Sequence, residues 1–536
     1  ITQRILNSSG SKTYDANTNA LAGAITLSNL VSGEALNHSG TATISSANAG
    51  SYTITNLAGI TIADGSGGAA SNYTLTGGTH NFTVNRRAVS VSGTRLYDAT
   101  TNAVASDLST HANLVGSQTL NLSGTGTLAD KNVANNKTVS VGTLALADGS
   151  NGGLAANYTL TGGTHQLTVN QRPLNATLAR QYDGTTASAG SDLSAFDALQ
   201  GGETLTLSGS GTSASANVAN GIAMSSNGNL ALVDGTGLAS NYSLNSTVIN
   251  ITQRILNSSG SKTYDANTDA LAGAITLSNL VSGEALNHSG TATTSSANAG
   301  SYTITNLAGI TIADGSGGTA SNYTLTGGTH NFTVNRRVVS VSGTRLYDAT
   351  TNAIASDLST HANLVGSETL NLSGTGTIAS KNVGSNKTVS VGTLALADGT
   401  NGGLAANYTL SGGTHQLTVN QRPLNATLAR QYDGTTASAG STLSSFDALQ
   451  GGETLTLSGS GTSASANVAN GIAMSSNGNL ALVDGTGLAS NYSLNSTVIN
   501  ITPRVLNSSG SKIYDANTDA LAGAITLSNL VSGEAL

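Results

Sequence analysis

The stretch Arg180-Gln181-Tyr182-Asp183-Gly184-Thr185-Thr186 decides how this sequence folds, because versions of it recur to the end of the chain. Its Tyr-Asp pair recurs at Tyr14, Tyr97, Tyr182, Tyr264, Tyr347, Tyr432 and Tyr514, each followed by Asp. The first copies are separated by 83, 85 and 82 residues. A fixed period of this length indicates an array of repeated structural units.

The period divides the chain into three kinds of repeat, which we name A, B and C. They occupy residues 1–83, 84–168 and 169–250, recur at 251–333, 334–418 and 419–500, and are followed by a partial A at 501–536. The two A–B–C blocks differ at about 14 positions. Because residues 501–536 stop within a repeat, we expect the sequence to be an interior part of a longer protein.

Composition favours many small cores and a neutral surface. Only 9% of the 536 residues are charged and 66 are Gly, whereas ordinary globular domains are about a quarter charged. A net charge of -7 without a basic cluster excludes nucleic acid as the expected partner. Cysteine is absent, so disulfides cannot stabilise the repeats. No apolar window is long enough to predict a membrane span.

Alternating apolar positions predict strands in every repeat. Leu205 and Leu207 alternate with threonines, and Asp-Gly turns at Asp64, Asp148 and Asp234 separate such runs. Helical periodicity is nearly absent. We therefore predict an all-β fold, a tandem array of small immunoglobulin-like β-sandwich modules that form a stiff rod without flexible linkers. A β-solenoid is the alternative, although no shorter coil period is found.

Recurring polar and aromatic residues are expected to be structural. The tyrosines of the Tyr-Asp and Asn-Tyr motifs are predicted to be the largest core side chains of each repeat, with their hydroxyl groups bonded at the rim. The aspartates should cap a turn or pair with the basic residue two places before the tyrosine, such as Lys12. The full set comprises Tyr14, Asp15, Tyr73, Tyr97, Asp98, Tyr158, Tyr182, Asp183, Tyr242 and the arginines Arg4, Arg87 and Arg172, which are expected to end the entry strands.

Candidates for chemistry are few. Asp64, Asp148 and Asp234 are weak calcium candidates, because a calcium site needs several carboxylates and each Asp-Gly segment offers one; Asp107 or Asp197 would have to contribute. Histidines such as His80 and His165 have no metal-ligand spacing and are expected on the surface or in turns. No catalytic residue, cofactor or enzymatic activity is expected, since no acid/base set distinguishes one repeat from another.

The ordered motifs resemble YDG-type repeats of large bacterial surface proteins of the filamentous-haemagglutinin and two-partner-secretion kind. The resemblance is carried by Arg172-Pro173-Leu174, the Tyr182-Asp183-Gly184 stretch, Asp130-Lys131-Asn132-Val133 and Asn241-Tyr242-Ser243-Leu244. It implies an exported adhesin or surface filament whose modules form a stalk. Repeats A and B carry Ala16 and Ala99 where C carries Gly184, which puts the turn after their aspartates in question.

We therefore expect an extracellular stalk or fibre segment at a bacterial cell surface, which extends a binding region or mediates contact between cells or with surfaces. Self-association into filaments or lateral bundles, and binding to glycans or proteins of a neighbouring cell, are the expected partner interactions. The alternative is that each repeat is a carbohydrate-binding module with exposed Tyr, Asn and Asp residues. That alternative fails if Tyr14 and Tyr73 are buried.

Overall fold

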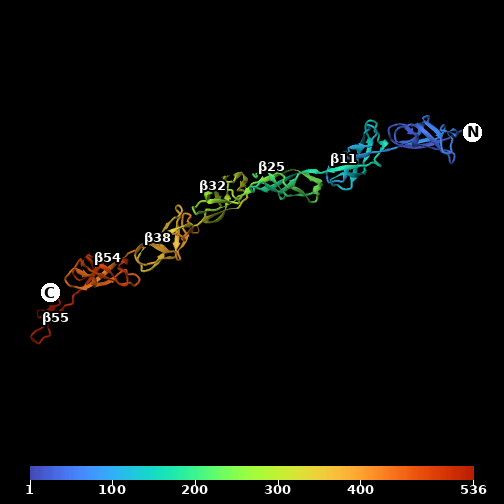
Figure 1. Ribbon diagram of the computed structural model, residues 1–536. Helices are drawn as coiled ribbons and strands as arrows, with labels where there is room; N and C mark the ends of the chain where they lie inside the picture. Colours follow the sequence, from blue (N-terminus) through green and yellow to red (C-terminus); the bar gives the residue numbers. More distant parts are fainter. The chain divides into compact units, whose positions relative to one another are not determined.

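The computed structural model describes all 536 residues, and these form β-strands joined by turns and short 3₁₀ helices (Figure 1). The all-β prediction is confirmed. The chain divides into two compact units, Ile1–Arg254 with Ser321–Thr324, and Ile255–Ala320 with Leu325–Leu536. No helix combines the length and apolar character needed to cross a membrane.

Repeat C shows the architecture most simply. Its strands are β20 (Arg172–Gln181), β21 (Ala187–Ala189), β22 (Leu193–Phe196), β23 (Leu205–Ser208), β24 (Ser210–Ser213), β25 (Ala219–Ser226), β26 (Ala231–Asp234) and β27 (Tyr242–Thr252). Six of them form one curled sheet in the order β21-β24-β25-β27-β20-β22, and β23 pairs with β26. The first strand, β20, therefore lies beside the last, β27, and the two run parallel.

Alternation of side chains explains why β20 and β27 form strands at the centre of the sheet. Leu174, Ala176 and Leu178 of β20 are buried, and Ile249 and Ile251 of β27 are buried with them. The residues between these point to the other face, because successive side chains of a strand alternate. A register shift of one residue would expose the whole apolar set. The core thus fixes how the first and last strands pair.

Repeats A and B have the same sheet order. The strands of A are β1 (Arg4–Ile5), β2 (Asn7–Thr13), β3 (Asn19–Leu21), β4 (Ile25–Ser28), β5 (Leu36–Ile44), β6 (Gly50–Asn56), β7 (Ile60–Asp64), β8 (Tyr73–Thr74) and β9 (His80–Asn85). Those of B are β10 (Arg87–Ala88), β11 (Ser90–Leu96), β12 (Asn102–Val104), β13 (Thr110–Ala112), β14 (Leu120–Ser123), β15 (Thr125–Leu128), β16 (Ala134–Ser140), β17 (Ala145–Asp148), β18 (Tyr158–Thr159) and β19 (Gln166–Asn170).

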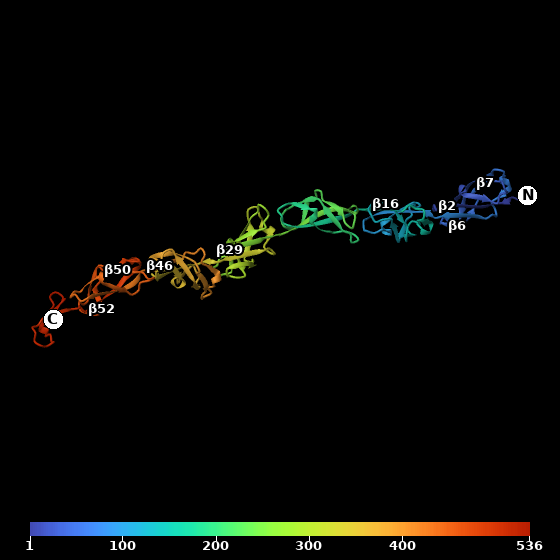
Figure 2. The same ribbon diagram turned by 90° about the horizontal axis from the view of Figure 1, so that it is seen from below.

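Curling of the sheet is clearest in repeat A, where β2, β6 and β7 are labelled at the blue end of Figure 2. The first half of β5 pairs with β7, and its second half pairs with β3 and β6. The sheet order is β3-β5-β6-β9-β2-β4, so the first and last long strands are again neighbours. The ladders within residues 1–252 join strands of the same repeat. Pairing that stays within one repeat differs from a solenoid, in which each coil pairs with the next.

The rest of the chain repeats these elements, and its strand β35 (Tyr323–Thr324) lies in the segment Ser321–Thr324 that belongs to the first unit. Its strands are β28 (Arg254–Ile255, which begins in the first unit), β29 (Asn257–Thr263), β30 (Asp269–Leu271), β31 (Ile275–Ser278), β32 (Leu286–Thr294), β33 (Gly300–Asn306), β34 (Ile310–Asp314), β35 (Tyr323–Thr324), β36 (His330–Asn335), β37 (Arg337–Val338), β38 (Ser340–Leu346), β39 (Asn352–Ile354), β40 (Thr360–Ala362), β41 (Leu370–Ser373), β42 (Thr375–Ile378), β43 (Gly384–Ser390), β44 (Ala395–Asp398), β45 (Tyr408–Thr409), β46 (Gln416–Asn420), β47 (Arg422–Gln431), β48 (Ala437–Ala439), β49 (Leu443–Phe446), β50 (Leu455–Ser458), β51 (Ser460–Ser463), β52 (Ala469–Ser476), β53 (Ala481–Asp484), β54 (Tyr492–Thr502), β55 (Asn507–Gly510) and β56 (Ile525–Ser528).

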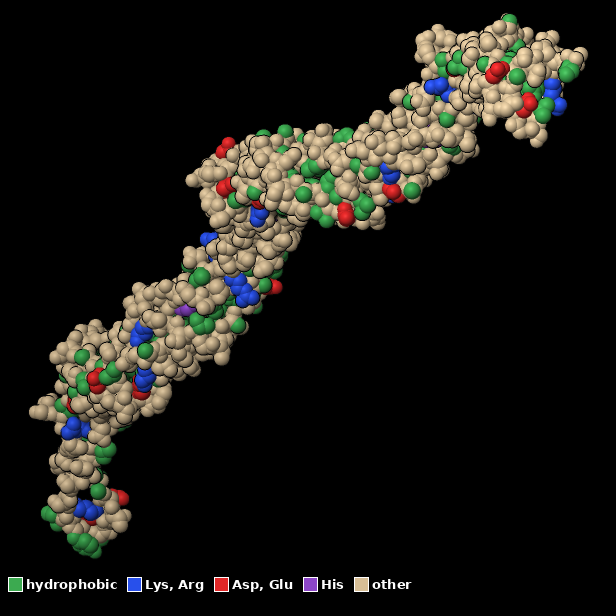
Figure 3. All heavy atoms as spheres, turned by 45° about the vertical axis from the view of Figure 1, so that its right-hand side comes forward, with side chains coloured by type: hydrophobic (Ala, Val, Ile, Leu, Met, Phe, Trp, Pro, Cys, Tyr) green, Lys and Arg blue, Asp and Glu red, His purple; other side chains and the backbone are tan.

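The connections from one repeat to the next are short. Strand β9 ends at Asn85 and β10 begins at Arg87, while β19 ends at Asn170 and β20 begins at Arg172. One residue therefore separates the last strand of A or B from the first strand of the following repeat. Charged side chains are scattered among neutral atoms on the face shown in Figure 3, without a large patch of one sign.

Candidate functional site: the junction between repeats

The Tyr-Asp stretch forms a tight loop at the end of the first long strand. In repeat C the Asp183 carboxylate accepts a hydrogen bond of 2.9 Å from the backbone N–H of Thr185, and Gly184 between them has φ 79°. Ala16 and Ala99 occupy the same place with φ 62° and 61°. The loop therefore has a left-handed residue in all three repeats, and the alanines adopt it although this conformation favours glycine.

The basic residue two places before the tyrosine closes this loop. Lys12 Nζ donates hydrogen bonds of 2.8 and 2.7 Å to the carbonyl oxygens of Asn17 and Asn19, and lies 2.8 Å from the Asp15 carboxylate. Burial raises the pKa of Asp15, but hydrogen bonds from Lys12 and the Asn17 N–H outweigh it, so the pKa lies below its ordinary value. In repeat C, Arg180 pairs with Asp183 and donates to the carbonyl of Thr185 at 2.6 Å.

The tyrosines of the two motifs meet across the boundary between repeats. Tyr14 of A lies edge-to-face on Tyr158 of B, with ring centroids 5.3 Å apart at 78°. Tyr97 of B meets Tyr242 of C at 5.2 Å and 77°. Each such pair contributes about 0.5–1.5 kcal/mol beyond the area it buries. As predicted, these tyrosines are among the largest buried side chains. Each ring also contacts a tyrosine of the neighbouring repeat, so the pair lies at the centre of the junction between two repeats.

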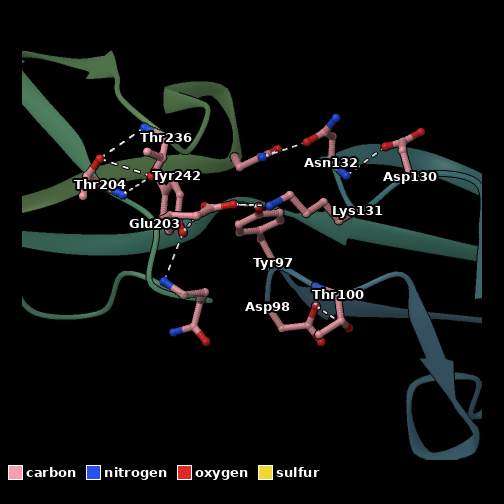
Figure 4. A network of polar contacts seen from close by, with 12 residues as sticks. Tyr97, Asp98, Thr100, Asp130, Lys131, Asn132, Glu203, Thr204, Thr236 and Tyr242 are labelled. Carbon is pink, nitrogen blue, oxygen red and sulfur yellow. Dashed lines mark hydrogen bonds and ion pairs between the residues drawn. The ribbon is translucent and has the colours of Figure 1, made fainter.

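A buried carboxylate lies beside the tyrosine pair at the B–C junction (Figure 4). Glu203 of C is 8% exposed. Its two oxygens accept hydrogen bonds from the hydroxyl groups of Tyr97 at 2.7 Å and Tyr242 at 2.8 Å, and Lys131 of B forms an ion pair with it. A buried charge requires partners of this kind, because unpaired it would cost several kcal/mol.

The same network shifts the protonation of its members. Burial raises the pKa of Glu203, but hydrogen bonds from Lys131, Tyr97 and Tyr242 outweigh it and hold the pKa below its ordinary value. Burial, followed by the hydrogen bond to Glu203, raises the pKa of Tyr242 to about 12. The junction therefore holds an ionised carboxylate and two neutral phenols at neutral pH.

The A–B junction has a different polar partner in each unit. In the first unit Gln118 donates to Tyr14 Oη at 2.9 Å and accepts from the Tyr158 hydroxyl. In the second unit this position is Glu368, which accepts from Tyr264 at 2.7 Å and from Tyr408 at 2.6 Å. The chain thus contains a neutral and an acidic version of the same junction.

The asparagine of the Asn-Tyr motif completes each junction with one bond to a backbone N–H and one to another asparagine side chain. Asn157 is fully buried, and its side chain accepts from the Ala49 N–H at 2.7 Å and donates to Asn48 at 2.9 Å. Asn241 makes the equivalent bonds to Val133 and Asn132, both 2.9 Å. These four bonds reach from one repeat to the repeat before it.

The arginines at the start of β10 and β20 also contact the preceding repeat. Arg172 Nε donates to the carbonyl of Tyr97 at 2.7 Å, and Arg87 donates to the carbonyl of Tyr14 at 3.4 Å. Arg4 donates to the carbonyl of Asn29 within its own repeat at 2.6 Å. Tyr73, the first Asn-Tyr tyrosine, donates to Glu34, the position that Gln118 and Glu203 occupy in B and C.

The calcium candidates act as turn caps in this structure. Asp64, Asp148 and Asp234 each accept a hydrogen bond from a backbone N–H that begins a 3₁₀ turn, at 2.7, 2.7 and 2.6 Å. Asp197 accepts from Asn175, and Asp107 lies in the 3₁₀ helix Ala105–Asp107. No group of three or more His, Asp or Glu side chains that could hold a metal ion occurs among residues 1–536.

Two histidines are placed differently from the sequence prediction. His80 and His165 are 8% and 5% exposed, where we expected surface or turn positions. His165 Nδ1 accepts from the backbone N–H of Val91 at 3.3 Å, and its Nε2 lies 2.8 Å from the carbonyl of Leu160. His80 lies 2.8 Å from both the Ser8 hydroxyl and the carbonyl of Leu75. Both rings are therefore part of the core, held by contacts that alternating patterns do not reveal.

The junction residues Glu203, Lys131, Gln118 and Asn157 had no assigned role in the sequence prediction. A signal for the first of them exists: Glu34, Gln118 and Glu203 recur once per repeat in a chain with 9% charged residues. A carboxylate or amide that returns at a fixed period in so neutral a sequence indicates a structural contact.

Comparison with known families and curated proteins agrees with the repeat pattern. The family described as YDG domain matches six segments, residues 2–81, 79–166, 164–249, 250–330, 333–417 and 415–499. No curated protein matches the chain.

Proposed function

Since the chain belongs to the YDG domain family, we propose that it is a structural stalk or fibre segment of a bacterial surface adhesin. In this role it extends a binding region away from the cell or mediates contact between cells. The export by a two-partner-secretion route and the extracellular location are parts of the same proposal. We also propose that each curled sheet is a variant of the immunoglobulin-like sandwich.

The observation that carries the proposal is the junction. The same tyrosine pair and the same buried asparagine recur at both junctions of residues 1–254, and a single residue connects the flanking strands. Contacts of this kind restrict bending between neighbouring modules, which a spacer of defined length requires and an independently acting module does not.

The tyrosines on which the carbohydrate-binding alternative depends are buried. Tyr14 and Tyr73 are each 2% exposed, so their rings offer no face on which a sugar could stack. The exposed Asn and Thr side chains that remain are spread over many strands. We therefore retain the stalk as the single proposed function.

Deletion of one whole block tests the proposal. In the protein on its native cell, removal of residues 251–500 leaves one copy of the A–B, B–C and C–A junctions, because these residues repeat residues 1–250, and it removes only the acidic version of the A–B junction. We expect adhesion to a target surface to fall while binding of soluble ligand stays unchanged. Replacement of the block by an unrelated array of β-modules of equal length should restore adhesion.

Two results would contradict the stalk. The first is saturable binding of a glycan or protein ligand by residues 1–536 alone. The second is adhesion that the unrelated spacer fails to restore, since that outcome would show a specific role for the deleted repeats. Sedimentation of residues 1–536 over a range of concentrations tests the accompanying proposal that the chains associate into filaments or lateral bundles.

A further inference from the structure

We propose that the parallel ladder between the first and last strands of each repeat is a mechanical clamp, and that repeat C carries the strongest one. The inference deepens the proposed stalk function, because a tether must resist tension along its own chain. It concerns a property that can be measured on the protein by itself.

The direction of the two strands creates the clamp. In repeat C the chain arrives at Arg172, at the start of β20, and leaves at Thr252, at the end of β27. The two strands are parallel and paired from Arg172↔Tyr242 to Gln181↔Thr252. Tension on the chain therefore pulls β20 backward and β27 forward along the same axis.

Such sliding loads the whole ladder at once. In a parallel pair the hydrogen bonds are evenly spaced and slant across the gap between the strands, so sliding stretches them together and all must break before the strands can move past each other. A ladder pulled apart from one end breaks one bond at a time. The same strands are thus strong along the chain and weak when they are peeled.

The length of the ladder differs among the repeats. The register contains six residue pairs between β2 and β9 in A, from Ser8↔His80 to Thr13↔Asn85. It contains five between β11 and β19 in B, and ten between β20 and β27 in C, where a register shift between Leu174 and Asn175 separates three pairs from an uninterrupted run of seven. The ladders β1–β8 and β10–β18 are separate two-residue pairs in A and B.

Side chains and the Tyr-Asp motif reinforce the ladder in C. Leu174 and Leu178 of β20, and Ile249 and Ile251 of β27, are at most 1% exposed, so sliding would also break the core contacts of both strands. The backbone N–H of Tyr182 donates to the carbonyl of Thr252 at 2.9 Å. The motif therefore lies where the clamp ends and the following repeat begins.

The lack of cysteine allows the clamp to be loaded in two directions in one repeat. Handles at Gln171→Cys and Gln253→Cys pull C along its chain. Handles at Gln171→Cys and Ser240→Cys, which both lie just before the first pair of the ladder, pull the same ladder from one end. Arg86→Cys with Gln171→Cys pulls B along its chain. All four positions are exposed, and all variants are made in residues 1–536.

The measurement is the lifetime of the folded repeat under constant force, which reports the rate of forced unfolding. Unfolding between residues 171 and 253 should release up to about 28 nm, since an extended residue spans about 3.3–3.6 Å. We expect C to last at least about tenfold longer when pulled along its chain than when peeled. C should also outlast B under the same chain-directed force.

Equal lifetimes of C in the two directions would overturn the clamp, and so would a B repeat that lasts as long as C. Hydrogen exchange of the unloaded variants provides the folding control, because all three should match the parent chain. The block deletion tests the stalk separately. If C lasts longer along its chain but the deletion leaves adhesion unaffected, the proposed function alone is rejected. If the two lifetimes are equal but the deletion impairs adhesion, the clamp alone is rejected.

Discussion

The two versions of the A–B junction predict that the same substitution, Tyr to Phe, destabilises the two junctions by different free energies. Tyr14 and Tyr264 occupy the same place in near-identical repeats, and each ring packs on its partner tyrosine at 5.3 or 5.4 Å. The hydroxyl of Tyr14 meets the neutral amide of Gln118, whereas that of Tyr264 donates to the carboxylate of Glu368. Substitution by Phe removes the hydroxyl and keeps the ring.

The partner sets the expected magnitude. A hydrogen bond between neutral groups contributes about 0.5–1.5 kcal/mol and one to a charged group about 1.5–3 kcal/mol. Tyr264→Phe also leaves the Glu368 carboxylate with the Tyr408 hydroxyl as its remaining tyrosine donor. We therefore expect Tyr264→Phe to cost about 1 kcal/mol more than Tyr14→Phe, or roughly a fivefold larger increase in opening of its junction.

Native-state hydrogen exchange of residues 1–536, read by mass spectrometry, provides the assay, because it resolves local opening. The reporting turn amides are those of Gln118 and Glu368, which donate to carbonyls three residues earlier at 3.1 and 3.0 Å. Gln118→Glu is the matched control, since it should raise the cost of Tyr14→Phe to that of Tyr264→Phe. Equal costs in the unaltered chain, or a larger cost at Tyr14, would refute the role of the carboxylate.

Three further predictions concern the loop, the buried asparagine and high pH. Ala16→Gly relieves a left-handed alanine (φ 62°) and should raise the free energy of unfolding of its repeat by about 0.5–1 kcal/mol in denaturant unfolding. Ala58→Gly, at an exposed turn without positive φ, should lower that free energy. A lower free energy of unfolding for both variants would contradict the strain at Ala16. Asn157→Ala leaves a buried backbone N–H without its acceptor and should cost about 1–3 kcal/mol in hydrogen exchange at the A–B junction, while Asn72→Ala, at the exposed equivalent, should change little. Burial raises the pKa of Tyr242 to about 12 from 10.0, so the neutral phenol should stabilise its junction fully below pH 10, and this stabilisation should be lost as pH rises through 12. Ultraviolet titration should show that Tyr242→Phe removes one of the tyrosines that ionise late. An unchanged titration would contradict the shift.

The local pattern of the sequence predicted the strands because alternation and turn residues act over a few positions. Leu205 and Leu207 lie in β23 and are buried as the alternation requires. The parallel pairing of β20 with β27 could not be predicted in the same way, since about 70 residues separate the paired positions and many strands of similar pattern lie between them.

The contacts of the junction could not be predicted from local sequence patterns either, because they join residues far apart in the sequence. Tyr97 and Glu203 are 106 positions apart, and Asn157 and the Ala49 N–H are 108 apart. A tyrosine that fills its own core and one that packs on the next repeat have the same local sequence. The turn after Asp15 was likewise undecided, because Ala16 tolerates a left-handed φ only where the surrounding bonds hold it.

The pairing of Lys131 with Glu203 distinguishes two ways in which the gene can change length. The position of Lys131 in B is occupied by Ala47 in A, so loss of a single B repeat would place the buried Glu203 after a repeat without a cation. Unequal crossing-over between the two near-identical blocks adds or removes 250 residues, a whole A–B–C set, and recreates each junction with its own partner. Exchange of complete blocks therefore preserves the Lys131–Glu203 ion pair, whereas loss of a single B repeat would leave Glu203 with tyrosine hydroxyls alone, as Glu368 is in the second unit.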